Sequence, residues 1–305
     1  MRVTEYMMLI RTQRYVSESF KRLGAAQEAL VSGVRIQKPS DDPVVIGQLY
    51  RLNEALAKAG VRERTLDRAG RWLATTEAAL ADIASTIRRV HDLALASANS
   101  PMNDAERISI LLEIEQAMAH LLDIANQRVD GRHIFAGHRT LTRPFDPPAS
   151  VGGVPTYVGD GGEILRPLGG GGVMAVNVPG EVLFNVGGID PAAPDVFVSL
   201  SELHQRILDA DVEAISDTSL ADLESIANHF LKMRATLGTG LQRVGWAQEV
   251  LLDAELRAES SRDQLVGLDV AEAIVAVQIQ ATAYEAALTA TAHLLHVPGM
   301  LSVVA

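Results

Sequence analysis

Histidine is the residue of this chain best suited to metal binding or acid–base chemistry, because the sequence contains no cysteine. Of the eight histidines, His293 and His296 alone lie three residues apart on one face of an expected helix. A metal site needs a third protein ligand, and the sequence places none nearby. We therefore interpret the pair as helix surface or interface and expect no metal ion. His133 and His138 flank a turn, so we expect both to be solvated loop residues.

Two further segments contain residues that occur in catalytic or phosphate-binding sites. Ser40, Asp41 and Asp42 could supply paired carboxylates, but Pro43 follows them, and aspartate before proline is typical of a helix N-cap. The glycines at 169–172 have no lysine beside them and precede a strand-like run, which indicates a turn instead of a phosphate cradle. Zinc-protease, P-loop, nucleophile-elbow and calcium-loop motifs are absent from the sequence. We therefore expect no catalytic residue and no cofactor.

The charge and hydropathy of the chain limit its partners. Its 305 residues carry a formal net charge of -11, whereas nucleic-acid-binding proteins cluster lysine and arginine on one face. No run reaches the roughly 18 apolar residues that span a bilayer, and the N-terminus does not resemble a cleaved signal peptide. We expect no nucleic-acid partner and no membrane partner, and a protein that is either cytoplasmic or exported without signal cleavage.

An insert rich in proline and glycine interrupts the helical parts of the chain. Eight of the twelve prolines lie between residues 144 and 194, and twelve of the 24 glycines lie between residues 151 and 188. Short β-branched or aromatic runs inside it predict small strands at 156–158, 173–178 and 182–186. We expect this insert to be an autonomous outer module.

Caps and breaks place the helices on both sides of the insert. Gly33 is the expected end of the first helix, Asn103 with Glu106 forms a capping signature, and Asp269 with Glu272 starts the last helix. The predicted helices are 3–32, 43–98, 103–129, 200–210, 219–264 and a last helix that ends before Pro298.

The first and last helices carry thin apolar stripes at heptad spacing. Near the C-terminus the stripe comprises Val270, Ile274, Val277, Ala281, Tyr284, Leu288, Thr291 and Leu295. Near the N-terminus it comprises Val3, Ile10, Phe20, Leu23 and Leu30, with Tyr6 and Ala26 between them. Residues 1–71 hold thirteen basic and eight acidic side chains, and residues 253–305 hold two and seven, so the ends should attract each other. We predict that the ends pair, form the assembly interface and become fully ordered only against partners.

Three segments resemble the bacterial flagellins and the flagellin-like hook-associated proteins. The first is Leu-Val-Ser-Gly-Val-Arg-Ile-Gln-Lys-Pro-Ser-Asp-Asp-Pro at 30–43, whose expected linker and helix cap are Arg35, Ser40, Asp41, Asp42 and Pro43. The second is Gly-Arg-His-Ile-Phe-Ala-Gly-His-Arg-Thr at 131–140, followed by Pro144 and Phe145. The third is Leu-Asp-Val-Ala-Glu-Ala-Ile at 268–274, with Gln278, Gln280, Ala281, Tyr284, Ala287 and Leu288.

The first two segments are more similar to the hook-associated protein 3 group, the hook–filament junction proteins, than to filament flagellins. The chain departs from the family pattern at Val34, where lysine is usual, at His133, where tyrosine is usual, and in its last residues, 299–305. These departures concern details of packing.

The resemblance implies a mainly α, flagellin-like fold in three layers. Residues 1–41 and 268–305 would form an inner coiled-coil layer, residues 42–140 and 199–267 a bundle of long helices, and residues 141–198 a small β-containing outer domain. The distribution of charge, caps and proline in the sequence favours the same division.

The resemblance also implies a structural function without catalysis. The chain would be exported unfolded through the flagellar type III apparatus and would join the hook to the filament in the extracellular flagellum. The implied partners are hook-associated protein 1, flagellin, further copies of the chain in a ring, and a flagellar export chaperone. Filament flagellin itself is the alternative. A coiled-coil translocator or tip protein of a virulence secretion system would not explain the linker at 30–43, and an enzyme insert would need a zinc motif that the sequence lacks.

Overall fold

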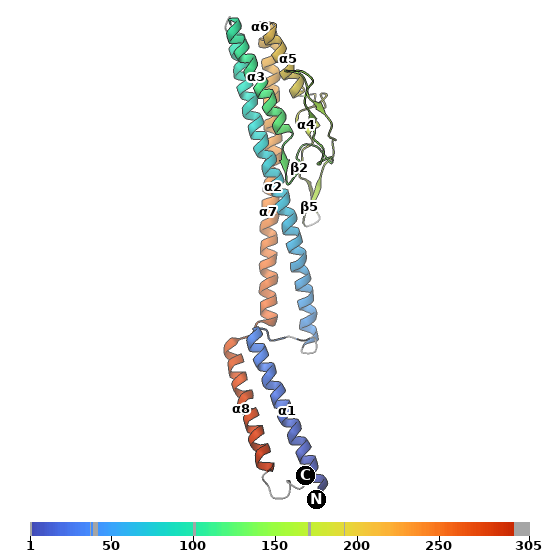
Figure 1. Cartoon of the computed structure of the whole chain (residues 1–305), viewed down its shortest axis with the longest axis vertical. Helices are drawn as coiled ribbons and strands as arrows, with labels where there is room; N and C mark the ends of the chain where they lie inside the picture. The colour runs from blue at the N-terminus through green and yellow to red at the C-terminus, as the bar shows by residue number, and fades with distance from the viewer. Residues whose placement is uncertain are drawn as a thin grey trace. The chain divides into compact units, whose positions relative to one another are not determined.

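The computed structural model describes residues 2–36, 38, 42–99, 102–169, 172–191 and 193–295. The long helices in this part of the chain are α1 (Arg2–Ser32), α2 (Pro43–Asn99), α3 (Asp104–Ala125), α5 (Val196–Leu208), α7 (Leu220–Val266) and α8 (Val270–Leu295), as Figure 1 shows. Short turns of helix form α4 (Gly180–Leu183), α6 (Val212–Ala214) and the π-helical η1 (Ile215–Ser219). The prediction of a mainly α fold is confirmed.

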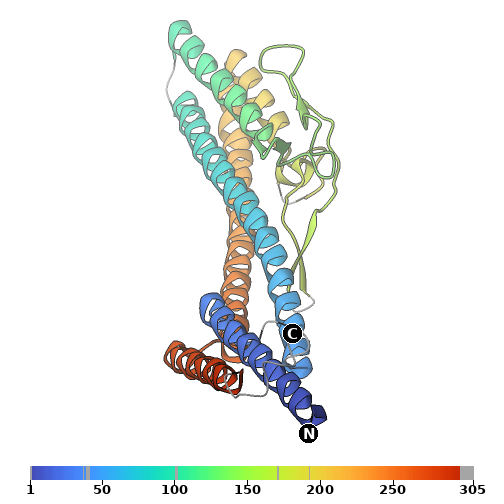
Figure 2. The ribbon, with the colours of Figure 1, turned by 60° about the horizontal axis from the view of Figure 1, so that its bottom comes forward.

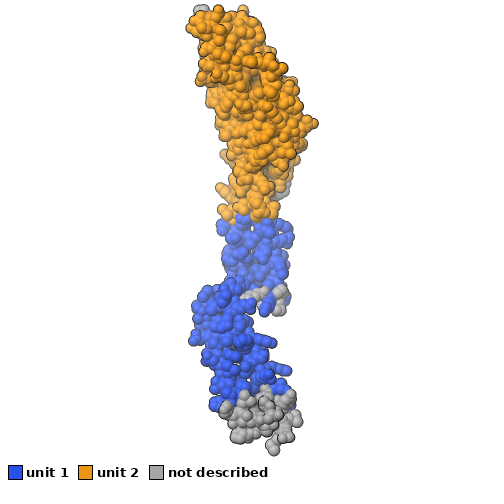
Figure 3. Space-filling model, viewed as in Figure 1, with its two compact units in different colours: residues 1–59, 253–305 blue, residues 60–252 orange. Residues whose placement is uncertain are grey.

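The chain divides into two compact units, coloured in Figure 3. Unit 1 comprises residues 1–59 and 253–305, and unit 2 comprises residues 60–252. The long helices α2 and α7 contribute to both units. The two units differ in how completely their side chains are buried, because nearly all the fully buried apolar residues belong to unit 2.

The helical core of unit 2 is formed by α2, α3, α5 and α7. The buried side chains of α2 recur from Leu66 to Ser97 at helical spacing, as expected of a helix that faces a core along one stripe. Arg234 of α7 donates from Nε to the Glu77 carboxylate of α2 at 3.1 Å, and Gln248 donates to Asp67 at 2.9 Å. These bonds fix how α7 lies along α2 within the unit.

Among the described residues, the strands form three separate two-stranded antiparallel sheets, which lie on one side of unit 2 (Figure 2). They pair β1 (Arg128–Val129) with β2 (Arg132–His133), β3 (Phe145–Asp146) with β4 (Thr156–Tyr157), and β5 (Leu165–Gly169) with β6 (Gly172–Ala175). The strands expected near 156–158 and 173–178 are therefore present in shorter form.

The prediction of a strand at 182–186 is wrong, because this segment forms the end of α4 and the turn that follows it. Leu183 and Phe184 donate backbone N–H groups to the carbonyls of Pro179 and Gly180, and Asn185 ends the helix with a left-handed φ of 50°. Gly180 is required here, since a Cβ at this position would lie 2.9 Å from the Phe135 carbonyl oxygen. The apolar run of Val182, Leu183 and Phe184 thus reflects burial of one side of a helical turn and not a strand.

A cluster of five phenylalanines joins the insert to the helices. Phe145 and Phe184 of the insert lie 5.0 Å apart between ring centroids, and Phe197 of α5 lies 5.1 Å from Phe184. Phe135 and Phe230 complete the cluster, and all five rings are fully buried. The insert therefore shares its core with α5 and α7, in contrast to the autonomous module expected from its composition.

The expected helix caps form, but two helices differ from their predicted bounds. The helix predicted at 200–210 is α5, which begins four residues earlier, at Val196. Gly33 ends α1 with a φ of +68°, and Asn103 and Glu106 exchange the two bonds of a capping box at 2.9 and 3.0 Å. Helix α3 ends at Ala125, four residues earlier than expected, because the Asn126 side chain bonds to both backbone groups of Phe145 at 3.1 Å.

His133 is buried, so the expectation that it is a solvated loop residue is wrong, whereas His138 is exposed. Arg128 donates from Nε to Nε2 of His133 at 2.9 Å, which leaves the Nδ1–H to donate to the Asn126 carbonyl at 2.7 Å. Burial lowers the pKa of His133, the Asn126 carbonyl acts in the opposite direction, and the positive charges of Arg128 and Arg143 lower it further.

Phe184→Ala is expected to destabilise unit 2 by about 3–5 kcal/mol, because it leaves a cavity at the centre of the aromatic cluster. The measurement is the free energy of unfolding in urea. Leu141→Ala, at a side chain that is 76% exposed, is the control and should change stability by less than about 0.5 kcal/mol. Equal effects of the two variants would contradict a shared core.

We expect unit 2 to lose stability as the pH falls through the ordinary histidine pKa of about 6.5. Below that pH the unfolded chain binds a proton at His133 that the folded chain, with its lowered pKa, does not bind. Urea unfolding at about pH 7.5 and about pH 5.5 measures the loss. His133→Gln should make the loss smaller, and His138→Gln, at an exposed position, should leave it unchanged. An unchanged loss in His133→Gln would exclude His133 as its source.

Candidate assembly interface

Helices α1 and α8 lie side by side in unit 1 and run antiparallel (Figure 1). The chain brings them together just beyond their adjoining ends, where Val34 and Gly267 form an isolated antiparallel bridge. Arg35 reinforces this bridge twice. Its backbone N–H donates to the Val266 carbonyl at 2.9 Å, and its guanidinium donates to the Leu265 carbonyl at 3.2 Å.

The seam between α1 and α8 has heptad spacing. Its half-buried residues on α1 are Thr12, Val16, Ser19, Leu23, Ala26 and Leu30. On α8 they are Val277, Gln280, Ala281, Tyr284, Ala287 and Thr291, with Ala273 buried at one end. Most of these side chains are small or polar, so the seam buries much less apolar surface than the core of unit 2.

The structure separates the predicted interface residues into two groups. Leu23, Leu30, Val277 and Tyr284 lie on the seam, while Ile10, Phe20, Val270, Ile274 and Leu288 are exposed. Phe20 still contacts Tyr284, with ring centroids 5.6 Å apart. Leu295 ends α8, and its side chain lies outside the described residues.

The exposed group follows from geometry. A single partner helix covers only a narrow stripe of α8, while the apolar residues of α8 occupy a wider arc. Val275 and Ile279 are also exposed, and they do not belong to the predicted stripe. The sequence of α8 could have predicted them, because it has few charged residues on any side. Such a composition is typical of a helix that packs against more than one neighbour.

The linker between α1 and α2 contributes a helix cap. Asp42 Oδ1 accepts hydrogen bonds from the backbone N–H groups of Val44 and Val45, both at 3.0 Å, and Pro43 is the first residue of α2. Ile36 is buried in the same linker. Ser40 and Asp41, predicted to take part in the cap, lie outside the described residues.

No group of three or more histidine, aspartate or glutamate side chains in the described part of the chain is placed to hold a metal ion. Of the paired histidines, His293 is exposed on α8 and His296 lies outside the described residues. No described helix is long and apolar enough to cross a membrane. The uncovered apolar side chains of α1 and α8 are thus the most distinctive surface of unit 1.

Comparisons with known proteins agree with the three sequence segments. Residues 3–140 match the bacterial flagellin N-terminal helical region. The chain is 26% identical to flagellar hook-associated protein 3 of Escherichia coli and 24% identical to that of Salmonella typhimurium, in each case over 94% of both chains. The flagellar filament 41 kDa core protein of Borreliella burgdorferi is 34% identical, but over only 34% of this chain.

Solved structures show the same fold. A flagellar hook-associated protein from Vibrio parahaemolyticus matches 74% of this chain with a TM-score of 0.66 at 16% identity, and the match covers 100% of that protein. The flagellar junction protein from Legionella pneumophila matches 72% of this chain with a TM-score of 0.59 at 14% identity, over 99% of its length. The chain is therefore similar over nearly its full length to flagellar hook-associated protein 3, and over only part of its length to flagellins.

Proposed function

We propose that this chain is a structural junction protein of the bacterial flagellum, which connects the hook, through hook-associated protein 1, to the flagellin filament. The observation that carries the proposal is the exposed apolar side of the paired terminal helices. Ile274 and Val275 of α8 are 51% and 57% exposed, although the side chains belong to the residue types most often buried. Further helices of the same kind would cover them in an assembly.

The energetics of the two units support assembly through unit 1. Full burial of a valine or isoleucine side chain contributes about 1.5–3 kcal/mol. Four such side chains on α8, Val270, Ile274, Val275 and Ile279, therefore offer several kcal/mol to a partner in addition to those on α1. Unit 2 has its own core, so it can fold before any partner arrives.

The relatives' names support flagellar partners. They are hook-associated and junction proteins of the flagellum, which fits a subunit with neighbours on both the hook side and the filament side. We infer that the chain lies outside the cell, is exported without a cleaved signal peptide, assembles with copies of itself into a ring, and is held by an export chaperone before assembly. The three layers expected from the sequence are part of the same proposal.

We also propose that the protein has no catalytic activity. The relatives are structural components of the flagellum. The buried polar residues of unit 2 serve structural roles, such as the hydrogen bonds of His133 and Asn126 that close the turn after α3.

The proposed function is tested by adding the purified protein to isolated hooks that carry hook-associated protein 1. We expect it to bind at the hook end, to permit addition of flagellin afterwards, and to form no long filaments alone. Electron microscopy and sedimentation measure both results. Long filaments formed by the protein alone would support filament flagellin instead, and failure to bind the hook end would contradict the junction role.

Ile274→Asp and Ala273→Asp should separate assembly from pairing within the monomer. The two positions are adjacent, but Ile274 is 51% exposed and Ala273 is 6% exposed against α1. Ile274→Asp should leave helix content unchanged and block addition to hooks, because it places a charge where a partner helix must pack. Ala273→Asp should reduce the helix content of the monomer, measured by circular dichroism. Normal assembly of Ile274→Asp would show that this face of α8 is not an interface.

The cap of α2 depends on hydrogen bonding by Asp42 and not on its charge. Asp42→Asn keeps the acceptor oxygen, so we expect assembly to survive, whereas Asp42→Leu removes the cap and should cost about 1 kcal/mol of local stability. Amide hydrogen exchange in the first turn of α2 measures the local opening. Damage from Asn equal to that from Leu would show that the carboxylate charge itself is required.

A further inference from the structure

Unit 2 contains a pocket of about 430 Å³, whose lining residues all belong to that unit. Its walls come from α2, from the β1–β2 hairpin with the turn that follows, and from the segments beside β5 and β6. The long-range packing of unit 2 thus brings together side chains from residues 65–72, 130–140 and 164–176. No property of the assembly proposed above requires such a pocket.

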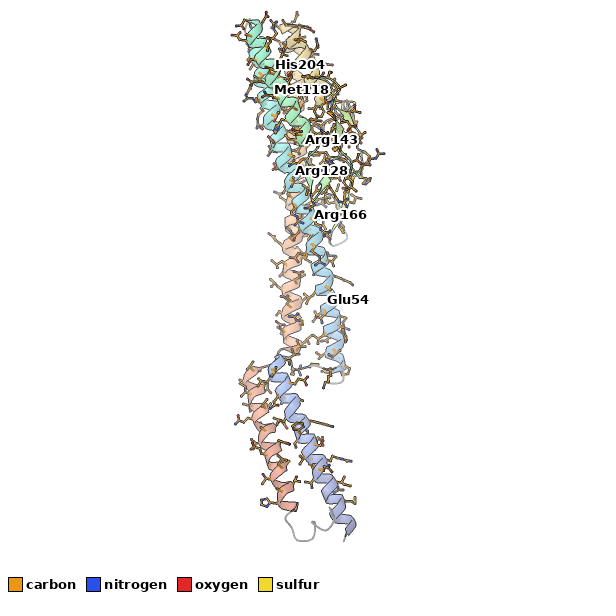
Figure 4. All side chains as sticks on the ribbon, viewed as in Figure 1. Glu54, Met118, Arg128, Arg143, Arg166 and His204 are labelled. Carbon is orange, nitrogen blue, oxygen red and sulfur yellow. The ribbon has the colours of Figure 1, made fainter. Side chains whose placement is uncertain are left out.

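Three arginines line the pocket: Arg68 of α2, Arg132 of β2 and Arg166 of β5. Asp130 lines it as well, so the wall carries two more positive than negative charges. This balance is opposite in sign to that of the chain, whose net charge is -11. Figure 4 labels Arg166, Arg128 and Arg143 on the part of unit 2 that carries the strands. The positive charges of Arg128 and Arg143 also lower the pKa of His133.

The three guanidinium groups are available to a ligand. Within the described residues, none of them forms an ion pair, although other arginines of unit 2 do: Arg89 with Glu113 at 2.8 Å and Arg206 with Glu202 at 2.9 Å. Arg132 donates from one nitrogen to Thr140 Oγ1 at 3.0 Å, which orients the guanidinium and leaves its other N–H groups available.

Trp72 provides a further polar group in the same wall. Its indole Nε1 is buried and has no hydrogen-bond acceptor among the residues that the structure describes. An indole N–H can only donate, and buried donors in folded proteins are normally satisfied. Because Nε1 is closed to solvent, an acceptor in the pocket would reach this donor only after the surrounding side chains shift, and the three arginines are the groups that an oxyanion would meet first.

We propose that this pocket binds a small ligand that carries a carboxylate or phosphate group. Guanidinium groups bind both kinds of oxyanion through paired, charge-assisted hydrogen bonds. Thr140 adds a hydroxyl group to the same wall, and because its oxygen accepts from Arg132, its hydrogen can donate to a remaining oxygen. The Thr65 hydroxyl already donates to the Val61 carbonyl at 3.0 Å. Because binding would be charge-assisted, it should weaken as the salt concentration rises.

Trp72 serves as the reporter of binding. The chain has two tryptophans, and Trp246 is exposed, so a Trp246→Phe protein retains Trp72 alone. Its fluorescence is followed while citrate or inorganic phosphate is added, with sodium chloride at matched ionic strength as the control. We expect a saturable change with at least one of the two anions and none with chloride. Saturation by citrate alone or phosphate alone identifies which oxyanion the pocket prefers.

Arg166→Gln in the same background should weaken the affinity about tenfold or more, because it removes a charged donor from the oxyanion. The matched control is Arg88→Gln, and this variant should bind the anion as before. Arg88 is exposed and lies about 24 Å along α2 from Trp72, at a rise of about 1.5 Å per residue. Circular dichroism checks that both variants fold. The proposal is overturned if neither anion gives a saturable change, or if Arg166→Gln and Arg88→Gln bind equally well.

Discussion

A long helix in water is stable along those turns where another element covers its apolar side, because helix propensity alone barely offsets the entropy of ordering the chain. Helix α2 shows this within one element. Its buried residues begin at Leu66 and continue to Ser97, so the longer part of the helix, in unit 2, faces a core, and the shorter part, in unit 1, has no buried residue. The same constraint separates α7, with nine buried residues, from α8, where Ala273 is the one buried residue among those whose side chains the structure describes.

This difference in burial divides the molecule into a part that completes its own core and a part that does not. Unit 2 closes around five phenylalanines and a set of aliphatic side chains on α2, α3 and α7. Unit 1 joins α1 to α8 through small seam residues and the backbone bonds of Arg35. In the junction role proposed above, this arrangement would leave the apolar surface of unit 1 to neighbouring subunits, while unit 2 buries its own core.

The inserted segment is integrated into unit 2 more closely than its proline and glycine content indicates. Phe145 and Phe184 supply part of the core on which Phe197 and Phe230 also depend, and Gly180 allows the close approach of α4 to Phe135. The same packing positions arginines from α2 and two strands around one pocket. A segment with few strand hydrogen bonds thus acquires both its shape and its basic surface from contacts with the helices.

Local sequence determined the helices, their caps and the family. Gly33, Asn103 and Asp42 act within a few residues of themselves, so their effect on the backbone can be inferred without a partner. Heptad spacing likewise predicted the seam through Leu23 and Tyr284. Tertiary structure decided which side chains the seam covers, why Ile274 is exposed, why His133 is buried and why residues 182–186 turn as a helix. These features depend on contacts between residues far apart in the chain, and the spacing of residues along one segment carries no information about which distant segment will cover it.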